Sequence, residues 1–154
     1  MPTAATREQI MAALQSRLQS IQVNGSAAFS AVTRRNVSPE TIASPGAPAL
    51  VLVKHHETYH RPSPAQPPRR TLTIMAIVYI DVGANANAIP DAVLNPIQDA
   101  IDAALAPAGA DAALGRQTLG GAVHDCKIVG VPVRDPGDLD GDGLAVVSVR
   151  LVGP

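Results

Sequence analysis

The stretch from Gln117 to Val152, QTLGGAVHDCKIVGVPVRDPGDLDGDGLAVVSVRLV, decides the fold class. A Thr-Leu-Gly-Gly sequence leads into a predicted strand over Ala122–Val131. A loop rich in Asp and Gly separates this strand from an apolar strand predicted over Leu144–Val152. No nucleophile–base pair, metal-ligand cluster or phosphate-binding loop is embedded in the stretch. We interpret it as two sheet strands whose role is assembly rather than chemistry.

The N-terminal segment has the pattern of an amphipathic helix over Thr6–Ile21. Apolar residues recur at helical spacing along one face, namely Ile10, Leu14, Leu18 and Ile21. Thr6 and Gln9 have the spacing of a capping box, in which each side chain accepts a hydrogen bond from a free backbone N–H at the helix start. The Asn24-Gly25 pair is predicted to end the helix in a left-handed conformation.

Three more strands are predicted before a second helix, over Ala27–Thr33, Leu50–Tyr59 and Thr71–Ile80. A helical turn is expected at Ser38–Ala43, with Pro in its first turn. The third of these strands is apolar on both faces, which is typical of a central strand covered on each side. Arg61–Arg70 contains four prolines, which cannot donate ladder hydrogen bonds. We therefore expect a stiff projecting loop there, with the flanking strands paired as a long hairpin.

A second helix is predicted over Ile89–Leu105, where apolar residues repeat every four positions opposite a polar face. Pro96 lies inside this pattern, so the helix either kinks there or restarts with Asn95 as its cap. We favour the restart because Gln98 completes a capping pattern. Ala106–Gly115 is predicted to be a linker of small residues.

These elements occur in the order α-β-β-β-α-β-β. Runs of strands separated by single helices indicate an α+β fold. We therefore expect a mixed, mostly antiparallel sheet of about five strands, with the two main helices packed on it. The length of 154 residues fits a single domain over 1–154.

Composition narrows the class of function. The chain is 46% hydrophobic but only 2% aromatic, so an aromatic-lined ligand pocket is not expected. Its net charge of −1 gives no global basic surface for nucleic acid. Cys126 is the single cysteine, which excludes an intramolecular disulfide. No signal peptide is apparent, and the longest apolar stretch, Ile74–Ile80, is too short to span a bilayer. We expect a soluble protein made in a cytoplasm.

Two motifs in the last third resemble ligand-binding loops. Asp138, Asp140, Asp142 and Gly143 fit the first half of an EF-hand calcium loop, but Val149 occupies the position of the bidentate carboxylate. A hairpin loop is the favoured interpretation. Gly120-Gly121 precedes a strand rather than a helix, so it is not a phosphate loop. We expect these glycines to permit a bulge or a close backbone approach.

The histidines and the cysteine raise the question of zinc or nucleophilic catalysis. On a regular strand His56 and His60 share a face, and His55 points to the other. Strand pairing would bring His124 or Cys126 near His56, but a closed zinc site needs four convergent ligands. Polar strand ends at a sheet rim or subunit interface are the favoured interpretation. His124 and Cys126 are too far apart on one strand for a nucleophile–base pair, so we expect Cys126 to be buried. No catalytic residue, metal or cofactor is predicted.

Charged residues gather at two places. The Pro-rich loop is basic, and the Arg34-Arg35 pair ends an adjacent predicted strand, so we expect the two to lie near each other. The candidate contacts to a partner or to passing nucleic acid are Arg34, Arg35, Arg61, Arg69 and Arg70. The alternative is a solvated hairpin tip. The candidate acidic contact loop contains Asp135, Asp138, Asp140 and Asp142.

Several local phrases carry a resemblance to a known family. They are the N-terminal EQIMAALQSRL, the central LTIMAIVYI, the Pro-interrupted AVLNPIQDAIDAAL, the TLGG turn before His124, and the final LAVVSVRLV. In layout and in these phrases the chain resembles the tail terminator proteins of long-tailed bacteriophages, also called tail completion or minor tail protein U-like proteins. The resemblance covers nearly the full chain, and the Pro-rich loop departs from it.

The resemblance implies a structural virion protein with no enzymatic activity. Such proteins form a homohexameric ring that caps the head-proximal end of the tail tube, stops its polymerisation and provides the head–tail joining surface. The implied partners are other copies of the chain, the tail tube protein and the head–tail connector or neck protein. DNA passes through the central hole without sequence-specific binding, and no membrane is involved. Assembly takes place in the host cytoplasm.

Two alternatives remain open at this point. One is another neck or head-completion connector ring protein, which shares the architecture but not the partner. The other is a small α+β enzyme or a metal- or ligand-binding domain, which requires a convergent polar pocket.

Overall fold

The computed structural model describes residues 4–38, 41, 48–83, 85, 87–135 and 142–153. Its helices are α1 (Arg7–Gln19), α3 (Pro90–Leu105) and α4 (Ala110–Leu114). Its strands are β1 (Gln22–Val23), β2 (Ser26–Ala27), β3 (Ala31–Thr33), β4 (Ala49–His60), β5 (Arg69–Asp81), β6 (Asp125–Asp135) and β7 (Asp142–Val152). Most of the predicted turn at Ser38–Ala43 lies outside the described residues. No helix in the described part of the chain is long and apolar enough to cross a bilayer.

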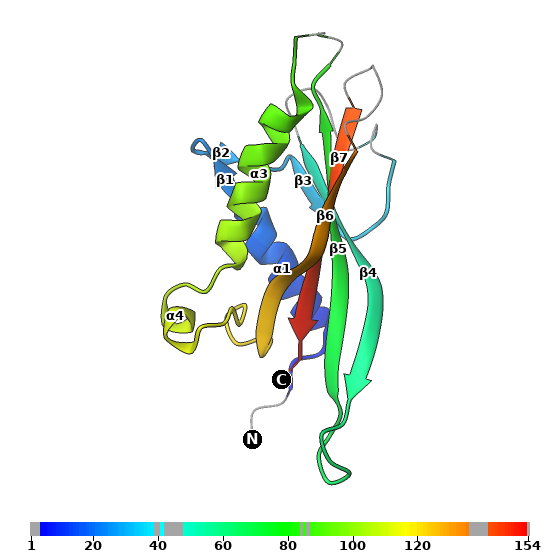
Figure 1. The fold of residues 1–154 in the computed structure, drawn as a ribbon, viewed down its shortest axis with the longest axis vertical. Coiled ribbons are helices and arrows are strands. Elements are labelled where there is room, and N and C mark those ends of the chain that lie inside the picture. Colours follow the sequence, from blue (N-terminus) through cyan, green and yellow to red (C-terminus); the bar gives the residue numbers. More distant parts are fainter. Residues whose placement is uncertain are drawn as a thin grey trace.

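Five of the strands form one sheet, in the order β3-β4-β5-β7-β6 (Figure 1). β3 runs parallel to β4, and all other neighbours in the sheet are antiparallel. The α+β class and the mixed, mostly antiparallel sheet with two main helices are therefore confirmed. β1 and β2 form a separate small hairpin.

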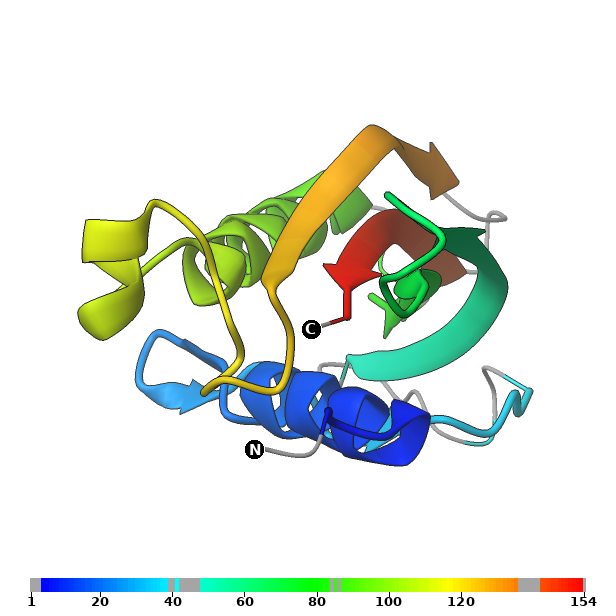
Figure 2. The ribbon, with the colours of Figure 1, turned by 90° about the horizontal axis from the view of Figure 1, so that it is seen from below.

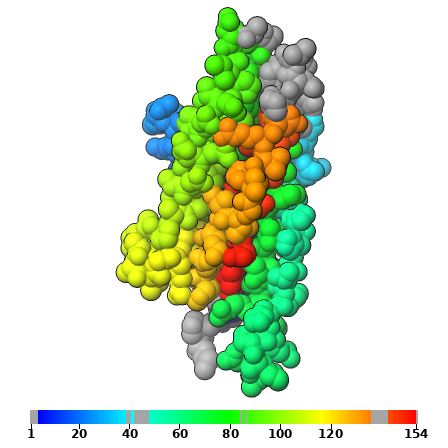
Figure 3. Space-filling model, in the orientation of Figure 1, coloured from blue at the N-terminus to red at the C-terminus, as the bar shows by residue number. Residues whose placement is uncertain are grey.

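The two long hairpins of the sheet are as predicted. β4 pairs with β5, and β6 pairs with β7, each across a β-bulge. The strands are longer than expected, so that Arg69 and Arg70 lie in β5 rather than in the Pro-rich loop. The loop itself, residues 61–68, projects from one end of the molecule (Figures 1 and 3).

The two main helices cover one face of the sheet (Figure 2). Because side chains alternate between the faces of a strand, every second residue of β5 points into this core. The core includes Ile10, Leu14 and Leu18 from α1, Leu94, Ile97 and Ile101 from α3, and Leu72, Ile74 and Val78 from β5.

The other face of the sheet has no helix over it in the described part of the chain. It is formed by the remaining residues of β5, from Thr71 to Tyr79, and by the residues that pair with them, and we call it the open face. Met75, Ile77 and Tyr79 are half-buried on it. The strand is central in the sheet, as predicted, but the expected cover on its second face is only partial. Apolar residues on both faces indicate two packing surfaces, but they do not specify what covers each one.

The start of α1 is confirmed and its predicted end is wrong. Thr6 Oγ1 accepts from the Gln9 N–H at 3.2 Å, and Gln9 Oε1 accepts from the Thr6 N–H at 2.8 Å, which completes the capping box. The helix ends at Gln19, capped by Ser20. Asn24 and Gly25 both have positive φ and form the turn between β1 and β2. Asn-Gly is the preferred sequence for such a two-residue hairpin turn.

The strand predicted over Ala27–Thr33 is divided into two pieces. Ala28 and Phe29 lie between β2 and β3, and both are buried in the core. The Ser30 N–H donates to the Pro48 carbonyl at 2.7 Å, which sets β3 beside the start of β4.

The predicted linker 106–115 contains α4, and Asp111 on this helix organises the TLGG turn. Its carboxylate accepts from the Thr118 N–H and hydroxyl, both at 2.8 Å, and these hydrogen bonds lower the pKa of Asp111. Gly120 and Gly121 both have positive φ, which L side chains rarely adopt. A Cβ at either position meets no atom within 4 Å, so the turn needs the glycines for their φ rather than for a close approach.

Gln117, which the sequence pattern did not single out, is a buried polar residue with 1% exposure. Its side-chain amide joins three segments. Nε2 donates to the Ala106 carbonyl at 2.8 Å, and Oε1 accepts from Arg17 at 3.1 Å and from the Leu119 N–H at 3.0 Å. These three hydrogen bonds of the buried amide fix the loop after α3 against α1.

α3 is one continuous helix with Pro96 inside it, so the predicted restart at Asn95 is wrong. Pro90 takes the first helical position, and no side chain caps this end. Pro96 and Ala92 are both exposed. Because the proline removes one hydrogen bond to the Ala92 carbonyl on the solvent side, water can satisfy that carbonyl.

Replacing this proline tests the continuous helix. Pro96→Ala should raise the free energy of unfolding by about 1–2 kcal/mol, because a restored helix hydrogen bond outweighs the added entropy of the unfolded chain. Asn95→Ala is the matched control and should change it by less than about 0.5 kcal/mol, whereas loss of a true N-cap costs about 1 kcal/mol. Urea denaturation measures both. A clear loss with Asn95→Ala and no gain with Pro96→Ala would support the restart instead.

Candidate functional site

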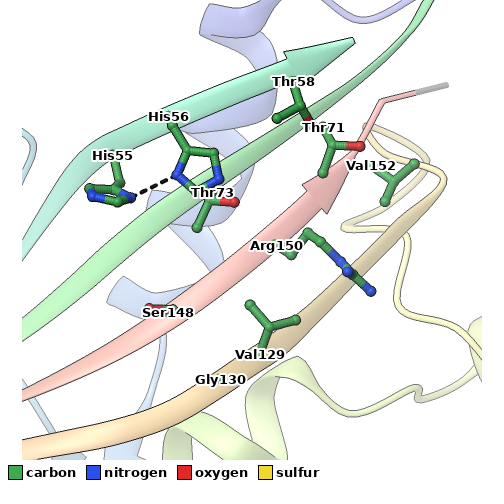
Figure 4. A pocket seen from close by; sticks show the side chains of 10 residues that line it. All are labelled: His55, His56, Thr58, Thr71, Thr73, Val129, Gly130, Ser148, Arg150 and Val152. Atoms are coloured by element: carbon green, nitrogen blue, oxygen red, sulfur yellow. Dashed lines mark hydrogen bonds between the residues drawn. The ribbon is translucent and has the colours of Figure 1, made fainter. Parts of the chain in front are cut away.

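The open face is hollowed toward one end by a groove of about 680 Å³, which all four long strands line (Figure 4). The lining residues are His55, His56 and Thr58 from β4, Thr71 and Thr73 from β5, Val129 and Gly130 from β6, and Ser148, Arg150 and Val152 from β7. Polar side chains therefore dominate this end of the open face, in contrast to Met75, Ile77 and Tyr79 further along it.

A β-bulge places two histidines on the same side of β4. The pairing register shifts between Lys54 and His56, so His55 is an extra residue without its own partner on β5. His55 and His56 both line the groove, and their Nδ1 atoms are 2.7 Å apart (Figure 4). The prediction that His55 points to the other face is wrong, because the bulge breaks the alternation on which it rested.

One cross-strand row carries positive charge from Arg150, which lines the groove, to Lys127 on β6, which does not line it. His56 is opposite Thr73, Thr73 is opposite Arg150, and Arg150 is opposite Lys127 on β6. Arg150 extends from β7 toward β6 (Figure 4), and its Nε is buried without a hydrogen-bond partner among the described residues. At the β6 end of this row, Lys127 Nζ forms an ion pair with Asp125 Oδ2 at 3.7 Å.

His124 and Cys126 do not join this groove. Cys126 is buried in the core on the helix-covered side, where burial raises the pKa of its thiol to about 12. His124 Nε2 accepts a hydrogen bond from Arg116 at 3.2 Å. The convergence with His56 that a zinc site requires is therefore not formed. The described ranges contain no cluster of three or more His, Cys, Asp or Glu side chains suited to a metal ion.

Two of the five candidate arginines are tied to the fold. Arg34 Nη1 lies 2.7 Å from Glu8 Oε1 and joins the end of β3 to α1. Arg70 is half-buried and donates to the Ala5 carbonyl at 3.2 Å. Arg34 is exposed despite this ion pair, as are Arg35, Arg61 and Arg69.

The structure does not bring the Arg34-Arg35 pair next to the Pro-rich loop. Thr33 is in register with Val51 near the start of β4, whereas the loop follows His60 at its end. At ~3.3 Å per residue, this separation is on the order of 30 Å. β3 and β4 are adjacent as expected, but β3 pairs only with the first residues of β4, and the Pro-rich loop follows the last residue of β4.

The acidic loop lies partly outside the described residues. Asp135 is the last residue of β6 and is exposed, and Asp142 is the first residue of β7. Asp138 and Asp140 fall outside the described part of the chain. Val149, at the twelfth position of the calcium-loop pattern, is fully buried in β7.

Two apolar surfaces lie away from the polar groove. On edge strand β6, Val131 is 83% exposed and Val133 is 59% exposed. A second groove, of about 610 Å³, runs between the β1–β2 hairpin and α3, and Ile89 at its rim is 65% exposed. β6 and the β1–β2 hairpin lie on opposite sides of α3 (Figure 2).

An ion-pair cluster that the sequence pattern did not reveal joins α1 to β4. The Arg7 guanidinium approaches the Glu57 carboxylate to 2.7 Å and donates to the Tyr59 hydroxyl at 2.7 Å. Lys54 also contacts Glu57. Hydrogen bonds from Arg7, and then from Lys54, hold the pKa of Glu57 at about 2. No local signal predicts this cluster, because Arg7 and Glu57 are distant in sequence.

Comparison of the chain with protein-family models matches no family, and comparison with curated proteins identifies no relative.

The Glu57 cluster predicts an acid-sensitive contribution to stability. A glutamate in the unfolded chain titrates near 4.3, and Glu57 in the folded protein near 2, so the folded state binds fewer protons between these values. Its contribution is present above about pH 4.5 and is lost as the pH falls toward 2. Glu57→Gln should lower the free energy of unfolding at pH 7 by about 1 kcal/mol and flatten its fall over this window.

Urea denaturation at several pH values measures this effect. Asp99→Asn is the matched control, since Asp99 is an exposed carboxylate on α3, and this variant should keep the wild-type acid dependence. Equal acid dependence of the wild type and Glu57→Gln would show that the cluster does not stabilise the fold.

Proposed function

We propose that this protein is a structural assembly protein of the tail terminator type. Copies of the chain would form a ring that caps the head-proximal end of a phage tail tube, stops tube growth and joins the tail to the head connector. The proposal combines the resemblance of the sequence with one structural observation, the pair of apolar surfaces on opposite sides of α3.

These two surfaces favour contact between copies of the chain. Exposed apolar patches with polar surroundings mark interaction sites. We propose that Val131 and Val133 of one copy pack into the groove beside Ile89 of the next. A contact between two different surfaces repeats around an axis, and it closes into a ring when the rotation per copy permits.

The edge strand that carries the valines is adapted to side-chain contact rather than to strand pairing. β6 contains Pro132, which has no N–H, and its register shifts between Val129 and Val133. Prolines and bulges on edge strands prevent open-ended pairing between chains. A ring held by the valine side chains would therefore not extend into a fibre through β6.

The two hairpin ends provide further contact elements in this proposal. The Pro-rich loop with Arg61, followed by Arg69, lies at the opposite end of the long hairpin from β3. The acidic loop 135–143 is the second contact element. One of the two loops would contact the tube or a neighbouring copy, and the other would contact the connector or the lumen. The rigid antiparallel strands between them would hold the two contacts at a fixed separation.

Electron microscopy of the purified protein, alone and mixed with tail tubes, tests the function. We expect rings, or density that caps one end of each tube and halts its growth. Protein that leaves the tubes uncapped and still growing would contradict the proposal, and the head connector would be the next partner to test.

Charged substitutions test the proposed contact. The double variant Val131→Lys/Val133→Lys, and separately Ile89→Lys, should abolish ring formation, because a buried lysine without a partner is costly. Leu114→Lys is the matched control, since Leu114 on α4 is 57% exposed but belongs to neither surface. Sedimentation velocity should show rings for the wild type and the control only. Rings that persist in the valine and Ile89 variants would exclude this contact.

A further inference from the structure

The polar groove of the open face has the composition of an anion-binding site. Its side chains supply hydrogen-bond donors from the three strands β4, β5 and β7, including the hydroxyls of three threonines and Ser148. Arg150 adds a guanidinium, whose buried Nε has no partner among the described residues. A buried polar group without a partner is uncommon in folded proteins, and a bound ligand is one of its explanations.

The cross-strand row strengthens this interpretation. Arg150 and Lys127 are directly opposite each other on β7 and β6. Like charges in directly opposed positions destabilise a sheet unless an anion lies between them. Asp125 compensates only Lys127, at 3.7 Å, and no carboxylate among the described residues forms an ion pair with Arg150. The row therefore carries an excess positive charge beside a set of hydroxyl donors.

The donors also define the class of ligand. Guanidinium and ammonium groups only donate hydrogen bonds, and the hydroxyls are free to donate to the same acceptor. An oxyanion with several oxygens can accept from Arg150 through two parallel hydrogen bonds and from Thr73 or Ser148 beside it. These residues are not suited to a metal ion, because the positive charges of Arg150 and Lys127 would repel a metal cation.

We propose that this groove binds a phosphate group, with Arg150 as the central contact and Lys127 as the second cation. The His55–His56 pair bounds the groove on the β4 side and offers ring nitrogens to the same ligand. The source of the phosphate is either a free anion or the backbone of DNA. This site does not depend on the proposed ring, because its residues all come from one chain.

Isothermal titration calorimetry with inorganic phosphate at low ionic strength tests the site. The wild type should bind phosphate saturably, and Arg150→Gln should weaken binding by at least roughly tenfold, as expected for loss of a charged hydrogen-bonding partner. Lys127→Gln should weaken it by a smaller factor. Lys54→Gln is the matched control. This substitution removes the same charge from the same sheet, but Lys54 lies outside the groove and pairs with Glu57.

Thermal unfolding with and without phosphate shows whether each variant is folded and whether it still binds the anion. Phosphate should raise the Tm of the wild type and of Lys54→Gln, because a ligand that binds the folded state stabilises it. It should not raise the Tm of Arg150→Gln. Without phosphate, Arg150→Gln should unfold at the same temperature as the wild type or higher, because the variant relieves the repulsion with Lys127.

A short DNA duplex distinguishes the two sources. Duplex binding that is lost in Arg150→Gln and displaced by inorganic phosphate would identify the DNA backbone as the source. Phosphate binding without duplex binding would identify a free anion. The proposal is overturned if the wild type does not bind phosphate saturably, or if Arg150→Gln binds it as well as the wild type does. Neither result bears on ring formation, which is measured separately.

Discussion

The alternation of side chains along β5 is the constraint on which the rest of the structure depends. This strand pairs with β4 on one side and with β7 on the other, so its two faces set the faces of the whole sheet. One face is filled by aliphatic residues that pack under α1 and α3. The register then assigns every polar and apolar residue of the neighbouring strands to the core or to the open face, because a shift of one residue would exchange the two sets.

The open face itself is divided along the strands. Its half nearer to Tyr79 is apolar, whereas the half nearer to Thr71 carries hydroxyls, histidines and arginine. The apolar half, with Met75, Ile77 and Tyr79, belongs to neither of the surfaces proposed for assembly. The apolar contact surfaces proposed for assembly and the polar groove proposed for phosphate use different residues, so substitutions can separate them.

Much of the fold can be predicted from periodicity, because the long strands and both main helices carry regular apolar patterns. The predictions are wrong where a local sequence fits two structures and only the tertiary contacts select one of them. Asn24-Gly25 suits both a helix end and a hairpin turn, and only the pairing of β1 with β2 selects the turn. Pro96 was expected to interrupt α3, but its exposed position allows water to replace the lost hydrogen bond.

The candidate site was less accessible from the sequence than the fold. The position of His55 depends on a bulge, and a bulge leaves no periodic signal in one strand. The row from His56 to Lys127 depends on the register of four strands that are far apart in the chain. Arg150 therefore reads as an ordinary strand residue until its neighbours across the sheet are known. The prediction that Arg34-Arg35 lies near the Pro-rich loop is wrong for the same reason. Knowing that two strands are adjacent does not tell which residues are in register.

The burial of Cys126 has a practical consequence. The thiolate is the reactive form of cysteine, and the raised pKa of about 12 leaves almost none of it at neutral pH. An alkylating reagent can therefore modify the folded protein only when the sheet separates from the helices. Because the chain contains no tryptophan, this one thiol is a more useful spectroscopic handle on opening of the core than intrinsic fluorescence. The rate of its modification would report how often β6 leaves its place beside α3.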